Sequence, residues 1–185
     1  MSKAGSGKDR LLLGNPFNGF IQDCHDCDHA AKQKTKFSKL RFIEIIQIMQ
    51  GKVKNGEDLY NNYLLLGNSF YNMTHYGNAR VFYEGDIAGE GSYVNDEVLE
   101  NKIYDMTNAK YYYQKALEAA TNDEQRAKCN YLLAKCERNE YYKNTGNDDF
   151  LAWDGFKKLK TKYSNTKYYK EVIKECGYFE KYAGN

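Results

Sequence analysis

The sequence contains little proline, no long apolar run and almost no net charge, and each shortage narrows the class of protein. A single proline among 185 residues favours helices. No apolar stretch approaches the roughly 20 residues of a membrane-spanning helix, so we expect no membrane insertion. The 27 basic and 25 acidic residues leave a formal charge of +2, which creates no overall field for nucleic acid, and we expect no nucleic-acid partner.

The cysteine count and the first residues limit what can be inferred about the compartment. Five cysteines do not form a closed disulfide framework, although one bridge with free thiols fits the number. The opening MSKAGSGKDR lacks the apolar segment of a signal peptide and leads abruptly into Leu11, so we expect a piece of a larger protein. A targeting signal upstream would be invisible, and the sequence therefore predicts no compartment.

Helical periodicity begins in the second fifth of the chain. Apolar residues from Phe37 to Met49 are dense enough to predict a buried helix, which Gly51 and then Asn55-Gly56 should end. A second apolar series from Leu99 to Ala120 follows a three-to-four step and predicts one helix of about seven turns. The glycine-rich residues 85–95 between them predict a loop.

The last third of the chain predicts more helices. Thr121 and Glu124 have the spacing of a capping box, in which each side chain accepts a hydrogen bond from a free backbone N–H group. A helix should therefore start there and run to about Lys143. A final helix is predicted at 167–182. Cys129 and Cys136 lie seven residues apart on one helix face, which predicts that both pack in the core.

Residues 63–70, YLLLGNSF, carry a repeat-like spacing. They read aromatic-x2-Leu-Gly-x2-aromatic, and Ala79-x3-Tyr83 follows. Small residues at Gly67 and Ala79 would let two antiparallel helices approach closely while the aromatic rings fill the adjacent groove. The Ala-x3-aromatic spacing recurs at Ala109-x3-Tyr113 and Ala152-x3-Phe156.

These patterns make residues 37–182 resemble the tetratricopeptide-repeat-like (TPR-like) helical-repeat superfamily. The resemblance implies an all-α fold, with antiparallel helix pairs stacked as a short right-handed array in a domain 37–185 after an N-terminal extension 1–36. The chain also looks like the C-terminal part of larger bacterial helical-repeat proteins. Such families generally bind peptides or protein segments, so the implied function is non-enzymatic protein–protein interaction or scaffolding. A purely structural domain is the alternative.

The resemblance also implies where a peptide would bind. Matching positions in the first repeat places four side chains toward the groove, and an amide at Asn68 would hold a peptide backbone or carboxylate. The basic residue that often assists is absent, because Leu64 occupies its place. In the other interpretation these side chains only pack against neighbouring helices or face water. The implied partner-binding residues are Asn61, Asn68, Tyr71 and Asn72.

Residues 23–29, DCHDCDH, are the one place where thiols, imidazoles and carboxylates crowd together. Cys-x2-Cys and His-x3-His spacings both occur in zinc sites. A site built from seven contiguous residues is strained, so a distant ligand such as His75 or Cys176 would be needed to complete it. The candidate zinc ligands are Cys24, His25, Cys27 and His29.

Two other interpretations of this segment stay open. Cys24 and Cys27 could form a structural or redox-active disulfide, although the three neighbouring aspartates should raise the pKa values of the thiols. Alternatively, an aspartate caps a short helix and the cysteines pack as small apolar groups. Elsewhere, seven lysines lie between Lys157 and Lys174 among tyrosines, a mixture also found in single-strand binders, but we expect a solvated face.

Overall fold

The computed structural model describes residues 11–12, 14–22, 35–84, 97–147 and 154–184. All regular secondary structure among these residues is helical, apart from one isolated bridge between Leu11 and Ser38, which confirms the predicted all-α class. The helices are α1 (Lys39–Lys54), α2 (Leu59–Met73), α3 (Val81–Glu84), α4 (Glu97–Tyr104), α5 (Thr107–Ala119), α6 (Asp123–Thr145), α7 (Asp154–Lys162), α8 (Lys167–Glu175) and α9 (Gly177–Gly184).

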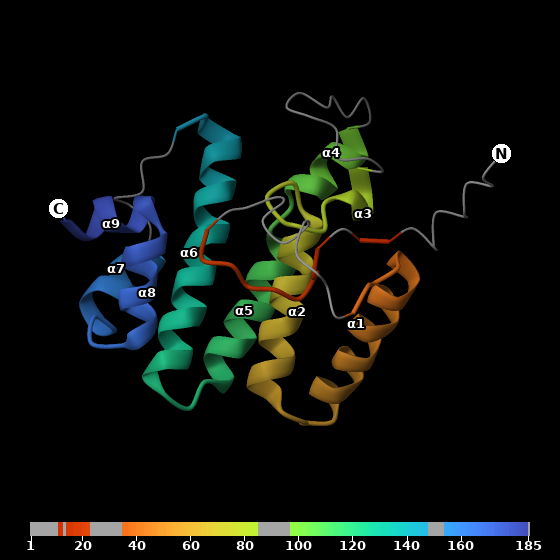
Figure 1. The fold of residues 1–185 in the computed structure, drawn as a ribbon, viewed down its shortest axis with the longest axis horizontal. Coiled ribbons are helices and arrows are strands. Elements are labelled where there is room, and N and C mark those ends of the chain that lie inside the picture. Colours follow the sequence, from red (N-terminus) through yellow and green to blue (C-terminus); the bar gives the residue numbers. More distant parts are fainter. Residues whose placement is uncertain (1–10, 13, 23–34, 85–96, 148–153, 185) are drawn as a thin grey trace.

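The long helices pack in a row. α1 contacts α2, α2 packs most extensively against α5, α5 contacts α6, and α7 to α9 lie beyond α6 (Figure 1). Short turns join α1 to α2 and α5 to α6 at one edge of this row, while α3 and α4 lie at the opposite edge (Figure 1). Within the described residues every helix is too short or too polar to span a bilayer.

The first predicted helix is present but longer than expected, and it is buried on one side only, since Phe42, Ile46 and Met49 are buried whereas Leu40 and Ile48 are exposed. α1 continues through Gly51 to Lys54, so the stop predicted at Gly51 was wrong and the stop at Asn55-Gly56 is confirmed. Gly56 has a φ of 79°, a conformation that glycine adopts without steric cost. At the other end, the Ser38 hydroxyl accepts the backbone N–H of Arg41 and caps the helix.

The close contact of α2 is with α5 and not with a helix at Ala79. Residues 74–80 form turns and bends, so the helix predicted to run through Ala79 to Tyr83 is reduced to the four residues of α3, which begins only at Val81. Gly67 instead faces the ring of Tyr113 on α5, where a Cβ atom on Gly67 would lie 2.5 Å from Cε1 of that ring. The predicted small residue therefore serves close packing, but with a partner much later in the chain.

Two helices predicted as continuous are each broken. α4 ends at Tyr104, and the Asp105 carboxylate then accepts the N–H of Thr107 to start α5. The final helix is divided into α8 and α9 at Cys176, whose N–H bonds to the Val172 carbonyl at 2.8 Å. In both cases the apolar pattern runs through the break, so periodicity alone does not mark it.

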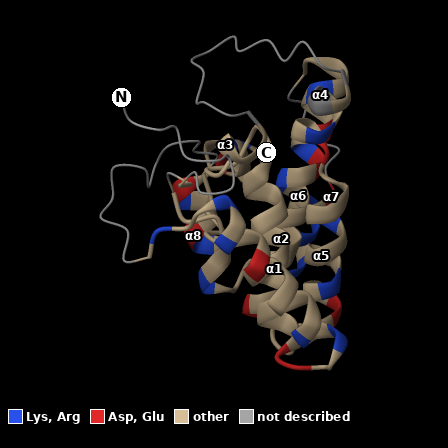
Figure 2. Ribbon diagram, turned by 90° about the vertical axis from the view of Figure 1, so that its right-hand side faces the viewer, with Lys and Arg blue, Asp and Glu red and all other residues tan. Residues whose placement is uncertain are grey.

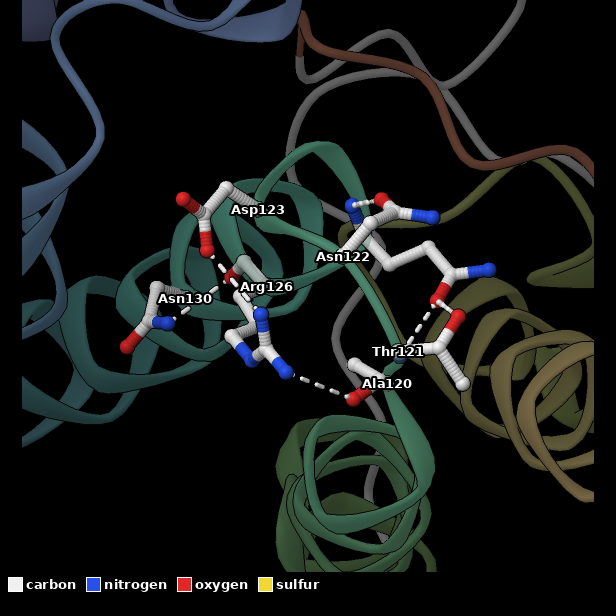
Figure 3. Close-up of polar contacts among 7 residues, drawn as sticks. Ala120, Thr121, Asn122, Asp123, Arg126 and Asn130 are labelled. Carbon is white, nitrogen blue, oxygen red and sulfur yellow. Dashed lines mark hydrogen bonds and ion pairs between the residues drawn. The ribbon is translucent and has the colours of Figure 1, made fainter.

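The start of α6 was predicted correctly but with the wrong side chains. The cap is Asn122, whose Oδ1 accepts the N–H of Gln125 at 3.0 Å, while Oε1 of Gln125 accepts the N–H of Thr121 at 2.7 Å (Figure 3). Arg126 ties the same turn to α5 through the Ala120 carbonyl at 3.1 Å (Figure 3). The cap is thus one residue later than expected, and the Gln125 side chain bonds the N–H of the residue before the cap, where a capping box would bond that of the cap itself.

Glu124, the predicted second member of that box, caps a different helix. Its carboxylate accepts the backbone N–H groups of Lys167 at 2.7 Å and Tyr168 at 3.0 Å, in the first turn of α8. These bonds to backbone amides lower the pKa of Glu124, because they stabilise the ionised carboxylate. The side chain therefore fastens α8 to α6.

The core is divided into two clusters. One surrounds Phe42 and Leu66 between α1 and α2, and the larger one continues through α5 and α6 to Phe179. Cys129 and Cys136 are buried in the larger cluster, as predicted. Burial raises the pKa of the Cys129 thiol to about 12, since desolvation disfavours the thiolate.

The packing of Gly67 against Tyr113 is testable by substitution. We expect Gly67→Ala to lower the free energy of unfolding by about 1–3 kcal/mol, because the methyl group overpacks the α2–α5 contact. Gly51→Ala is the matched control. It lies in α1 with no atom near the added methyl group, and should raise stability by about 0.5–1 kcal/mol. Chemical denaturation measures both; equal effects of the two variants would contradict the assignment.

Candidate functional site: a strap across two helices

A segment of the N-terminal extension lies across the helices and turns once, where the backbone N–H of Asn18 donates to the Asn15 carbonyl at 3.2 Å. Residues 14–22, which we name the strap, have no helical or strand structure and cross α2 and α6 (Figure 1). The helices hold the strap mainly through its backbone carbonyl groups. The surface that donates these hydrogen bonds, the strap-binding face, consists of Asn68, Asn72, Asn78, Tyr131 and Lys135.

α2 and the turn after it hold the first half of the strap. Nδ2 of Asn68 donates to the Phe17 carbonyl at 2.9 Å, and Nδ2 of Asn72 donates to the carbonyls of Pro16 at 3.0 Å and Asn18 at 2.8 Å. Both asparagines are buried and lie one turn apart on the same helix face. The amide of Asn78 continues the series with a bond to the Asn15 carbonyl at 3.1 Å.

A residue of α5 orients the first of these amides. The Tyr113 hydroxyl donates to Oδ1 of Asn68 at 3.0 Å, which directs the Nδ2 group of Asn68 toward the strap. Tyr113 is the ring that occupies the space beside Gly67. The contact that brings α2 and α5 together therefore also positions the binding face.

α6 holds the second half of the strap. The Tyr131 hydroxyl donates to the Ile21 carbonyl at 2.5 Å, and Nζ of Lys135 donates to the Phe20 carbonyl at 2.8 Å. These two side chains are also one helical turn apart on one face. A residual space of about 10 Å³ lies between the strap and the helices, room for at most one water molecule.

Two strap residues make contacts that depend on their side chains. The Phe17 ring packs edge-on against Phe37 and Phe42, with centroid distances of 5.4 Å and 5.3 Å. Gly19 lies against Asn68, and a Cβ atom there would be 3.0 Å from the amide nitrogen of Asn68. The strap is thus recognised through its backbone, which turns at residues 15–18, through the ring of Phe17 and through the absence of a side chain at Gly19.

Lys135 is the charged group of the binding face. Its side chain is fully buried, and desolvation lowers its pKa to about 8. Nζ lies 4.7 Å from the centre of the Tyr71 ring, so the ring face and the Phe20 carbonyl both stabilise the ammonium group. The Tyr71 hydroxyl in turn accepts an N–H from Nδ2 of Asn139 at 2.9 Å.

The structure brings three of the four expected partner-binding residues together. Asn68, Tyr71 and Asn72 surround the strap, whereas Asn61 is exposed at the start of α2 and donates to the Asp58 carboxylate at 2.9 Å. A partner that reached Asn68 or Asn72 would meet the strap first. The sequence patterns missed Asn78, Tyr131 and Lys135, and the asparagine-rich motif of the strap itself, GNPFNGF, was the available signal.

This chain has no matched relative. Comparison with protein-family models, with curated proteins and with solved structures gives no match. The assignment of function therefore depends on the geometry of the described residues.

The expected metal ligands Cys24, His25, Cys27 and His29 lie outside the described residues. Among the described ones, no group of three or more His, Cys, Asp or Glu side chains could hold a metal ion. A pocket of about 390 Å³ lies at the end of the strap, lined by Gln22, Arg138 and Cys176 among others. In it, Nε and Nη2 of Arg138 donate to Oδ1 of Asn139 at 3.1 Å and 2.9 Å.

The lysine-rich residues of α7 and α8 lie away from the strap-binding face. Lys158 forms an ion pair with Asp154, and Nζ of Lys160 lies 5.6 Å from the centre of the Tyr182 ring. In the ribbon view of Figure 2, acidic positions are interspersed among the basic ones along the helices. This arrangement is typical of a solvated surface.

The buried ammonium group of Lys135 predicts a pH-dependent effect on stability. Below pH 8 the lysine is charged in both the folded and the unfolded state, so folding bears the full cost of burying the charge. This cost disappears as the pH rises from 8 toward 10.5, the ordinary pKa of lysine, because the folded state loses the proton first. Lys135→Met removes the group. The free energy of unfolding of Lys135→Met minus that of the wild type should therefore fall by about 2 kcal/mol between pH 7.5 and pH 10.

Urea denaturation at both pH values measures this difference. Lys170→Met, at an exposed position on α8, is the control, and its difference from the wild type should stay constant. A difference for Lys135→Met that is equally independent of pH would show that Lys135 is not buried beneath the strap.

Proposed function

We propose that this chain is a non-enzymatic helical-repeat module that holds a protein segment across α2 and α6, and that it serves protein–protein interaction or scaffolding. The observation that carries the proposal is the strap. Backbone carbonyls of six strap residues accept hydrogen bonds from side chains of the strap-binding face. Binding through the backbone is how a groove accepts peptides with different side chains.

The proposal includes a TPR-like right-handed array of antiparallel pairs, α2 with α5 and α6 with α7. The close contact of Gly67 with Tyr113 supports the first pair. Gly155 on α7 supports the second, because a Cβ atom there would lie 2.7 Å from that of Ala134 on α6. In this assignment α2 and α6 are the first helices of their pairs, whose shared face binds peptides in the superfamily.

The two buried thiols of α6 are unsuited to nucleophilic catalysis. Burial raises the pKa values of Cys129 and Cys136, and a thiol must ionise to act as a nucleophile. Both are on α6, and their side chains are buried in the larger core cluster. Their chemistry is that of small apolar side chains.

Peptide binding in trans tests the proposal. The probe is a fluorescent peptide of residues 11–22, LLLGNPFNGFIQ. The receptor is the full chain with Phe17→Ala, a substitution that weakens the binding of its own strap. We expect saturable binding by anisotropy. Adding Asn72→Ala should weaken the affinity by about 5- to 100-fold, because a buried and a partly buried hydrogen bond to strap carbonyls are lost.

Asn61→Ala in the same receptor is the matched control, since this asparagine is exposed and bonds only to Asp58 among the contacts described for it. It should change the affinity less than twofold. Absence of saturable binding, or equal losses for Asn61→Ala and Asn72→Ala, would contradict a peptide-binding face on α2.

A second candidate function is metal or thiol-redox chemistry at Cys24 and Cys27. One observation favours it. Gln22, which comes just before residues 23–29 in the sequence, lines the same pocket as the buried free thiol of Cys176. Elemental analysis of protein purified without added metal, with a count of free thiols, tests it. Bound zinc that Cys176→Ser reduces would support this function, and five free thiols without metal would exclude it.

A further inference from the structure

The chemistry of the strap specifies the partner of the same face. We infer that the strap-binding face selects a segment of another protein with an aromatic residue, one spacer and then a glycine, and that the strap is a built-in competitor that such a segment must displace. This inference rests on the proposed function. The aromatic residue corresponds to Phe17 of the strap, and the glycine corresponds to Gly19.

The aromatic requirement comes from the space that Phe17 fills. Its ring is held edge-on between Phe37, just before α1, and Phe42 on α1, and these rings belong to the cluster that α1 and α2 share. A segment without an aromatic ring would leave this site between apolar walls unfilled. Edge-to-face geometry also favours a planar ring over an aliphatic side chain.

The glycine requirement comes from the amide of Asn68. Oδ1 of this amide is held by Tyr113 and Nδ2 by the Phe17 carbonyl, so the group has little freedom to move away from Gly19. A methyl group 3.0 Å from both polar atoms of the amide would therefore force the amide to shift by a few tenths of an ångström and weaken these bonds. The two requirements are coupled, because the same amide binds the aromatic residue's carbonyl and limits the size of the residue two positions later.

Competition by the strap follows from its covalent attachment. The strap binds within one molecule and loses no translational freedom, so an identical segment in solution binds more weakly than its contacts alone would allow. The same argument disfavours a second copy as the partner, because each copy's segment is already held by its own face. The fitting partner is a separate protein with an exposed segment of this type.

The proposal is tested by competition with the labelled peptide of residues 11–22. Unlabelled peptides carry single changes, Phe17→Ala, Gly19→Ala or the control Gln22→Ala, an exposed position at the strap's end. The receptor is the full chain with Phe17→Ala. Relative to the unchanged peptide, we expect the inhibitory concentration to rise at least 10-fold for Phe17→Ala, at least 5-fold for Gly19→Ala and less than twofold for Gln22→Ala.

The wild-type chain should bind the labelled peptide at least 10-fold more weakly than the Phe17→Ala chain. A Gly19→Ala chain supplies a second weakened strap if Phe17→Ala lowers folding, and circular dichroism checks both. If the labelled peptide does not bind any receptor, the proposed function itself fails. Three outcomes would contradict this inference alone. The labelled peptide binds but all competitor peptides inhibit equally, the wild-type and Phe17→Ala chains bind it with equal affinity, or the wild-type chain dimerises in sedimentation.

Discussion

Buried hydrogen-bond donors on α2 and α6 are the constraint on which the rest of the structure depends. Asn68, Asn72 and Lys135 have almost no contact with solvent, and a buried donor without an acceptor would destabilise the fold by roughly 1–3 kcal/mol or more. The strap carbonyls are acceptors for all three. The strap therefore acts as part of the folded helical body, although it lies in the N-terminal extension.

Two buried tyrosines link the helix core to the hydrogen bonds that hold the strap. Tyr113 fills the gap beside Gly67 and orients an amide, and Tyr131 packs in the core while its hydroxyl reaches the strap. Each ring contributes apolar area at one end and a hydrogen bond at the other. A tyrosine at such a site joins the packing of the helices to the recognition of a backbone.

Local patterns predicted most helices and few of their ends. The repeat-like spacing located α2 and the capping signal located the start of α6, while α1 was located by apolar periodicity. Periodicity failed at Asp105 and Cys176, where the apolar spacing continues but the helix does not. The repeat-like spacing failed around Ala79, where the residues form turns and the contact of Gly67 is supplied by α5, whose Tyr113 lies 46 positions later in the sequence.

The candidate site was also predicted only in part from the sequence. The resemblance placed Asn68, Tyr71 and Asn72 on one functional face, because positions one turn apart on a helix share a side. It could not predict that the chain's own residues lie on that face, since bonds such as that from Lys135 to Phe20 join residues 115 positions apart. Nothing in the spacing of α6 distinguishes such a donor from an ordinary core residue.

The central claim is that the strap lies on α2 and α6 in solution, and nuclear Overhauser contacts test it most directly. In the full chain with labelled phenylalanines, ring protons of Phe17 and Phe42 should show cross-peaks, given a centroid distance of 5.3 Å. The side-chain amide of Asn72 should exchange slowly with solvent. Random-coil shifts for residues 14–22 without these cross-peaks would contradict the account.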